Sequence, residues 1–205
     1  ARLGTRHDDV LRRHIELFAD GGKLLVLLAT AELIGLGATN YDTPDFRLKG
    51  GLQVNGQPMA SSTWIFTTDE NATAEYLSGA FGGEIEVLDV EKGDDRQIVS
   101  ETSSVDVLIT DAKALTSVMV LYGLNGPIHK CDGMYSLLED EEGEPCGCPA
   151  SFAERKALAR KGRGPSPEIK LRFQLASNPE LGVGLYRTGS WSLVRDIPDL
   201  EDALA

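Results

Sequence analysis

Four side chains that bind transition metals stand in two close pairs along this chain, and they restrict its fold more than any other feature. His129 and Cys131 flank one residue, and Cys146 and Cys148 flank Gly147. Zinc prefers thiolate sulfur and imidazole nitrogen in a tetrahedron, and structural zinc sites are filled by four protein ligands. One ion held by both pairs would bring the two segments together and close residues 132–145 into an exposed loop. We therefore predict a structural Zn²⁺ ion bound by His129, Cys131, Cys146 and Cys148.

The same residues allow other interpretations. Small thiols are common in protein cores, so the cysteines could be buried side chains beside an unrelated histidine. An iron–sulfur cluster is disfavoured because the paired spacing lacks the usual cluster pattern. A catalytic zinc is disfavoured because four filled positions leave no room for an activated water. The odd count of three cysteines also argues against a disulfide framework.

The charge of the chain limits its partners. The formal net charge is -12 over 205 residues, whereas a protein that binds duplex DNA on its own usually carries a basic excess. We therefore expect contact with DNA to be indirect, and an acidic surface suits docking on a basic protein. No apolar run approaches the roughly 20 residues that span a bilayer. The longest one, at 24–37, lacks a signal-peptide cleavage pattern, so we expect a cytosolic protein without a membrane partner.

The hydrophobic periodicity predicts two regions. Residues 8–19 have near-helical spacing and 23–36 could be a buried helix or a strand, so we predict an N-terminal helical segment at 1–42. Residues 43–205 read as an α+β domain, mainly an antiparallel sheet with flanking helices and a zinc-stapled loop. Its predicted helices are 69–81 and 151–161, and its predicted strands are 62–67, 85–90, 97–109, 117–122, 168–176 and 185–194.

Five basic side chains follow the cysteines, at the end of the second predicted helix: Arg155, Lys156, Arg160, Lys161 and Arg163. They either bind a partner, which would be DNA phosphate or an acidic protein surface, or they form a solvated helix face without a partner.

The sequence gives little support for catalytic motifs. No Gly-x-Ser-x-Gly elbow and no phosphate-binding Gly-x-x-x-x-Gly-Lys-Ser/Thr loop occurs, and the candidate base His129 is assigned to the metal.

Five strings carry a resemblance to a known family: LYGLNGPIHKCDG at 121–133, GEPCGCP at 143–149, ERKALARKGRGP at 154–165, GLYRTGSW at 184–191 and NGQPMASSTWIFTT at 55–68. They resemble phage recombination directionality factors, the accessory proteins that partner large serine integrases in actinobacterial phages. The resemblance covers residues 45–195, and the strings around the metal ligands are fairly specific. The first forty residues match no part of this family, and we expect further sequence after Asp199.

The resemblance implies a non-enzymatic protein that binds a serine integrase on attachment-site DNA, largely through the coiled-coil region of the integrase. Such a protein redirects recombination from integration to excision, and it works in the cytosol of the bacterial host without a small-molecule substrate. Two alternatives stay open. One is a metal-dependent hydrolase, which needs an open coordination position and a carboxylate base. The other is a zinc-stabilised phage structural protein whose N-terminal helices drive assembly.

Overall fold

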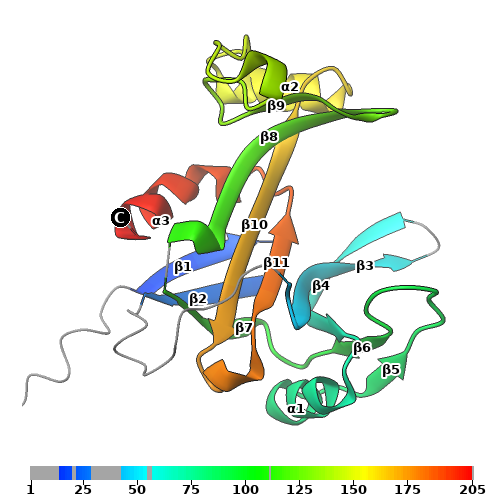
Figure 1. Cartoon of the computed structure of the whole chain (residues 1–205). Helices are drawn as coiled ribbons and strands as arrows, with labels where there is room; N and C mark the ends of the chain where they lie inside the picture. The colour runs from blue at the N-terminus through cyan, green and yellow to red at the C-terminus, as the bar shows by residue number, and fades with distance from the viewer. Residues whose placement is uncertain (1–13, 20–21, 29–42, 55–56, 111, 205) are drawn as a thin grey trace, which may run out of the picture.

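The computed structural model describes residues 14–19, 22–28, 43–54, 57–110 and 112–204 (Figure 1). The strands are β1 (His14–Ala19), β2 (Gly22–Leu28), β3 (Phe46–Val54), β4 (Gln57–Thr68), β5 (Ile85–Val87), β6 (Arg96–Val99), β7 (Ser104–Ile109), β8 (Leu115–Gly123), β9 (Gly126–Cys131), β10 (Ser166–Leu175) and β11 (Gly184–Thr188). The α-helices are α1 (Asn71–Phe81), α2 (Phe152–Arg160) and α3 (Ile197–Leu204). Short 3₁₀ turns stand at Ala112–Ala114, Glu139–Glu141, Pro179–Leu181 and Leu193–Arg195.

The strands form one continuous sheet that curls around the core. Its order is β1-β2-β7-β10-β11-β3-β4-β6-β5, and β8 and β9 branch from it because β8 pairs with β10 and with β9. Among the described strands, β2 and β7 pair in parallel, as do β11 and β3, and the other pairs are antiparallel. The predicted α+β class with a mainly antiparallel sheet is therefore confirmed.

The long strand β10 organises the sheet. Its first half pairs with β8, its last two residues pair with β7, and its other edge pairs with β11. The alternation predicted for this strand is confirmed, because its apolar side chains are all buried: Ile169, Leu171, Phe173 and Leu175. One face of β10 therefore lines the core, while the chain continues upward along β8 and β10 away from it (Figure 1).

Aromatic side chains fill the centre of the core. The ring of Phe46 in β3 packs edge-on against Phe173, with centroids 5.8 Å apart. Trp64 in β4 packs edge-on against Tyr186 in β11 at 5.4 Å. These four side chains are fully buried. Such edge-to-face pairs add to the stabilisation that burial of the rings provides. The helix α1 closes the side of this core, where the ring of Phe81 stacks on the fully buried Phe66 at 4.9 Å.

The N-terminal prediction of helices is wrong where the structure describes it. Residues 14–19 and 22–28 form strands β1 and β2, which pair with each other, and β2 extends the sheet beside β7. Glu16 is exposed while Leu17 is buried, and Leu24 and Val26 are buried on β2, which is the alternation of a strand. The short apolar segments are compatible with both helical and strand spacing, and pairing within the sheet selects the strand. Residues 1–13 and 29–42 lie outside the described residues, and the boundary at 42/43 stays a prediction.

Other predicted elements differ in their extent. The predicted strand at 85–90 is only β5, whose three side chains are exposed, and the pattern at 97–109 is divided between β6 and β7. The predicted strand at 185–194 ends at Thr188 and gives way to a 3₁₀ turn. The strand β9 and the helix α3 had no predicted counterpart. Among the described residues, none of the helices has the length and apolar character needed to cross a bilayer.

Candidate metal centre

The first ligand pair belongs to strand β9. His129 and Cys131 are two positions apart, so their side chains emerge on the same face of the strand. The hairpin with β8 fixes this strand, because Leu121 is paired with His129 and Met119 with Cys131. Cys131 is fully buried and His129 is partly buried. The β8–β9 hairpin therefore places two metal-binding side chains side by side on one face of β9.

The chain after Cys131 turns back at once. The side-chain oxygen of Asp132 accepts hydrogen bonds from the backbone N–H groups of Met134 (2.7 Å) and Tyr135 (2.8 Å). These two bonds lower the pKa of the Asp132 carboxyl. The N–H of Leu137 then donates to the carbonyl of Lys130 at 2.8 Å, which ties the returning chain to the outer edge of β9.

Residues 132–145, which we predicted to be an exposed loop, are exposed over most of their length but carry their own backbone bonds. The N–H of Ser136 donates to the carbonyl of Glu144 at 2.7 Å, and that of Gly143 donates to Ser136 at 3.0 Å. The N–H of Cys146 donates to the carbonyl of Met134 at 2.9 Å. The second ligand pair is thus held beside the first by the backbone as well as by any ion. Gly147 between the two cysteines has φ +69°, a conformation that glycine adopts without steric cost.

The four predicted ligands come together. One donor atom from each of His129, Cys131, Cys146 and Cys148 lies within 4.8 Å of the others. The sulfur of Cys148 is 3.9 Å from that of Cys131 and 3.3 Å from Nε2 of His129. Zinc–sulfur and zinc–nitrogen bonds of about 2.3 and 2.0 Å place ligand atoms about 3.5 to 3.8 Å apart around a tetrahedral ion. The donor set and its spacing therefore fit a metal ion of this kind.

The thiol groups show why a cation suits this cluster. Burial, partly offset by a hydrogen bond from the backbone of Gly133, raises the pKa of Cys131 to about 12. Burial also raises the pKa of Cys148. For Cys146 burial acts in the same direction, but hydrogen bonds from Cys148 and Cys131 and the charge of Arg155 outweigh it and lower the pKa. Neighbouring thiolates repel one another, and a bound cation would remove that repulsion.

Arg155 joins the two ligand segments from the helix α2. Its Nη2 donates to the carbonyl of Gly133 at 2.8 Å, and its Nε donates to the carbonyl of Pro149. Gly133 follows Cys131 by two residues, and Pro149 follows Cys148 directly. The planar guanidinium can donate in two directions at once, which a lysine ammonium does not do with the same geometry. Sequence reasoning grouped Arg155 with the partner-binding residues and missed this bridging position, which the spacing along the chain does not reveal.

The other basic residues predicted to bind a partner lie along and just after α2. Lys156 is partly buried, and the remaining three are exposed: Arg160, Lys161 and Arg163. The helix begins after Ser151, whose side chain accepts a hydrogen bond from the N–H of Glu154 at 3.4 Å. No residue of α2 is fully buried. Their partner-binding role stays a prediction.

We call residues 121–163 the metal lobe. It consists of the tip of the β8–β9 hairpin, the loop that carries the cysteines, and α2. Figure 1 shows the lobe at the top, carried by the upper ends of β8 and β10 and separate from α1 and β5 at the bottom. The buried apolar core lies in the sheet below it, and from the lobe the ring of Phe152 packs edge-on against Trp191 at 5.3 Å. The described part of the lobe therefore has no large apolar core of its own, and its backbone bonds and the contacts of Arg155 hold its segments together.

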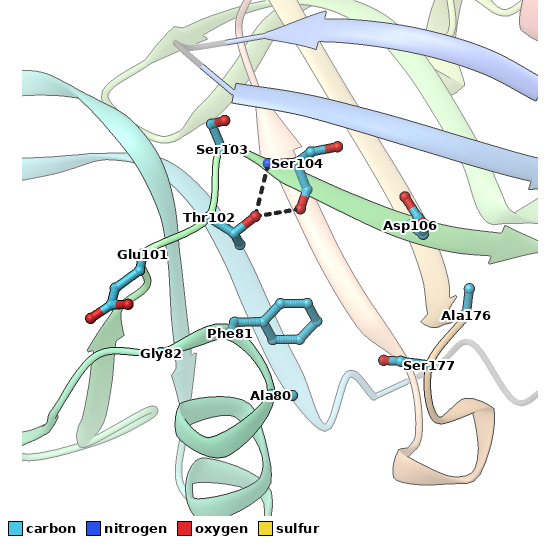
Figure 2. Close-up of a pocket in the computed structure, with 10 residues that line it drawn as sticks. All are labelled: Ala80, Phe81, Gly82, Glu101, Thr102, Ser103, Ser104, Asp106, Ala176 and Ser177. Carbon is cyan, nitrogen blue, oxygen red and sulfur yellow. Dashed lines mark hydrogen bonds between the residues drawn. The ribbon is translucent and has the colours of Figure 1, made fainter.

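A separate pocket lies at the other end of the molecule, between the end of α1, the segment 101–106 and the turn after β10 (Figure 2). Hydroxyl groups and carboxylates line it. The hydroxyl of Thr102 donates to the carbonyl of Ser104 at 2.7 Å and accepts from its N–H at 3.2 Å. The pocket is lined by neither histidine nor cysteine and shares no residue with the metal lobe. It therefore adds no catalytic group to the metal centre.

The comparison with known families agrees with the resemblance of the sequence strings. A model of the Gp3-like family, described as recombination directionality factor-like, matches residues 34–205, which extends further on both sides than those strings. No solved structure matches the chain. Since the family match covers most of its length, the chain belongs to the Gp3-like family of recombination directionality factor-like proteins.

Proposed function

We propose that this chain is a non-enzymatic regulator that binds a large serine integrase and shifts site-specific recombination toward excision. The family match over residues 34–205 carries the proposal. The chain docks on the coiled-coil region of the integrase and meets DNA through that protein, in the cytosol of the bacterial host. A net charge of -12 supports indirect contact, because phosphate repels an acidic chain.

In the same proposal, zinc fills the candidate metal centre in a structural role. Three thiolates and one imidazole supply a full tetrahedral set, so the ion would cross-link β9 to residues 146–148. A hydrolase would need an open position on the metal and a carboxylate base beside it. The spacing of the four donors gives no support to that alternative. The metal lobe is then a rigid shape for recognition.

The regulator acts by a difference in affinity. An integrase that can adopt an integration or an excision arrangement changes its balance only if this chain binds one arrangement more tightly. A complete reversal from about 1:99 to 99:1 requires roughly 10⁴-fold tighter binding to the favoured arrangement. No chemical step by the regulator is needed, and the sequence carries neither a Gly-x-Ser-x-Gly elbow nor a phosphate-binding Gly-x-x-x-x-Gly-Lys-Ser/Thr loop.

Recombination with purified components tests the proposal. The chain is added to the serine integrase of the same phage, once with the left and right hybrid attachment sites and once with the original phage and bacterial sites. We expect the chain to permit excision between the hybrid sites and to suppress integration between the original ones. An unchanged direction of the products over a range of chain concentrations would contradict the proposal. A stable homo-oligomer with no affinity for the integrase would instead favour an assembly protein.

A further inference from the structure

We infer that the tip of the β8–β9 hairpin is the surface through which the metal lobe docks on its protein partner. The tip presents three large apolar side chains to solvent, which we call the hairpin patch: Tyr122, Leu124 and Ile128, with exposed fractions of 58%, 105% and 63%. The occupant is a protein segment that presents apolar side chains bordered by lysine or arginine. This inference rests on the proposed function only in taking that segment to belong to the integrase.

The position of the hairpin patch is not required by the fold. Leu124 stands in the two-residue turn between β8 and β9, outside the sheet, and it is fully exposed. Ile128 lies against Gly123, where a β-carbon would come 2.7 Å from its methyl carbon, so any larger residue at 123 would have to displace the Ile128 side chain. Turns usually carry polar residues, so three large exposed apolar side chains within seven residues of one hairpin tip are unusual unless they serve a binding surface.

The hairpin is also built to hold its shape. Behind the tip, backbone bonds from Leu137 to Lys130 (2.8 Å) and from Cys146 to Met134 (2.9 Å) hold the following chain against β9, and an ion in the candidate metal centre would add a cross-link. On the other side, the hydroxyl of Tyr122 donates to the carboxylate of Glu168 on β10 at 3.0 Å. A preorganised surface loses little conformational entropy when it binds, so its apolar contacts contribute more of their free energy to affinity.

Charge around the hairpin patch identifies the chemistry of the occupant. On the Tyr122 side, Glu168 forms ion pairs with Lys170 at 2.8 Å and Arg187 at 2.6 Å, so this carboxylate is already paired and is not free to attract a basic partner. On the β9 side, the chain that follows Leu137 enters the exposed acidic run 139–142. Within the described part of the chain, no salt bridge involves this run. A partner with basic side chains on that border would complement it, whereas a second copy with a net charge of -12 is disfavoured overall.

Binding of the full chain to the integrase of the same phage tests the hairpin patch. The main variant is Leu124→Asp, which places a charge at the centre of the patch on a side chain that makes no contribution to the core. A second variant, Glu141→Lys, reverses a charge in the acidic run. The matched control is Val87→Asp, an exposed apolar side chain (73%) on β5 in a different part of the sheet. Zinc content and thermal unfolding verify that each variant is folded.

We expect Leu124→Asp to weaken binding by about tenfold or more and Glu141→Lys by a few fold, while Val87→Asp binds like the wild type. Unchanged binding by Leu124→Asp would overturn the hairpin patch and leave the proposed function intact. Equal losses in Leu124→Asp and Val87→Asp would also overturn it. No binding by the wild type would overturn both. Self-association of the wild type that Leu124→Asp abolishes would assign the surface to a second copy and overturn the choice of occupant.

Discussion

At the scale of single residues, a predicted metal ligand and a non-ligand residue beside the candidate metal centre should respond differently to substitution. Cys148→Ser removes one of the four predicted ligands, whereas Lys130→Gln changes the residue between His129 and Cys131, which is not among the predicted ligands. Because metal binding contributes directly to folding in such sites, we expect Cys148→Ser to destabilise the metal lobe by about 3 kcal/mol or more. Elemental analysis and amide exchange in residues 126–163 measure this. Less than stoichiometric zinc in the wild type would contradict the assignment.

Arg155 provides a second test at this scale, because its guanidinium holds two backbone carbonyls at once. Arg155→Lys keeps the positive charge but loses the paired geometry, and Lys156→Ala is the matched control on the next residue of α2. We expect Arg155→Lys to lower the free energy of unfolding of the lobe by roughly 1.5 to 3 kcal/mol, as for hydrogen bonds from a charged donor. The measurement is urea unfolding with the zinc concentration held constant. A lysine variant as stable as the wild type would show that charge alone matters at this position.

At the scale of elements, Glu168 on β10 links its strand to β8 and β11, and it makes the stability of these three strands depend on pH. Burial alone would raise its pKa, but hydrogen bonds from Lys170, Arg187 and Tyr122 outweigh burial and lower the pKa to about 2. The folded-state pKa is therefore below the ordinary value of 4.5, so the stabilisation is complete above about pH 4.5 and is lost as the pH falls toward 2. Solvent screening limits this contribution to about 1 kcal/mol.

The matching experiment compares wild type and Glu168→Gln by urea unfolding between pH 7 and pH 3. We expect the wild type to be the more stable at pH 7 and the difference to shrink as the pH falls. Glu180→Gln, at an exposed carboxylate outside these ion pairs, is the control. If the difference in unfolding free energy between wild type and Glu168→Gln stayed constant with pH, the ion pairs of Glu168 would not contribute to the stability of β8, β10 and β11.

The same scale shows which elements the sequence could predict. Strand β10 could be predicted because four buried apolar positions alternate along it. The grouping of the four metal ligands could be predicted because all four donor residues stand in two short sequence strings. Strand β1 could not, because residues 14–19 fit helical spacing too and only pairing with β2 selects the extended form. The contacts of Arg155 could not be predicted, because Gly133, one of its two partners, lies 22 residues away in the sequence and no local pattern encodes such a contact.

At the scale of the whole molecule, the metal lobe and the sheet core should lose structure separately. The large buried side chains belong to the core, among them Trp64, Phe66 and Tyr186, and α2 contributes no fully buried residue. If zinc fills the centre as proposed, a chelator would remove a large part of the stabilisation of the lobe while the core keeps its own. We expect chelation to abolish amide protection in residues 126–163 and to leave β3, β4 and β11 protected.

This separation connects the metal to the proposed function through the docking surface. If the lobe holds the hairpin patch in place, the chelated chain should bind the integrase more weakly although its core stays folded, and added zinc should restore binding. Val87→Asp, with its substitution outside the lobe, should show the same loss and recovery. If binding were lost only when the core itself unfolds, the ion would merely support global stability. If the chelated chain bound as tightly as the zinc-loaded one, recognition would belong to the sheet and not to the lobe.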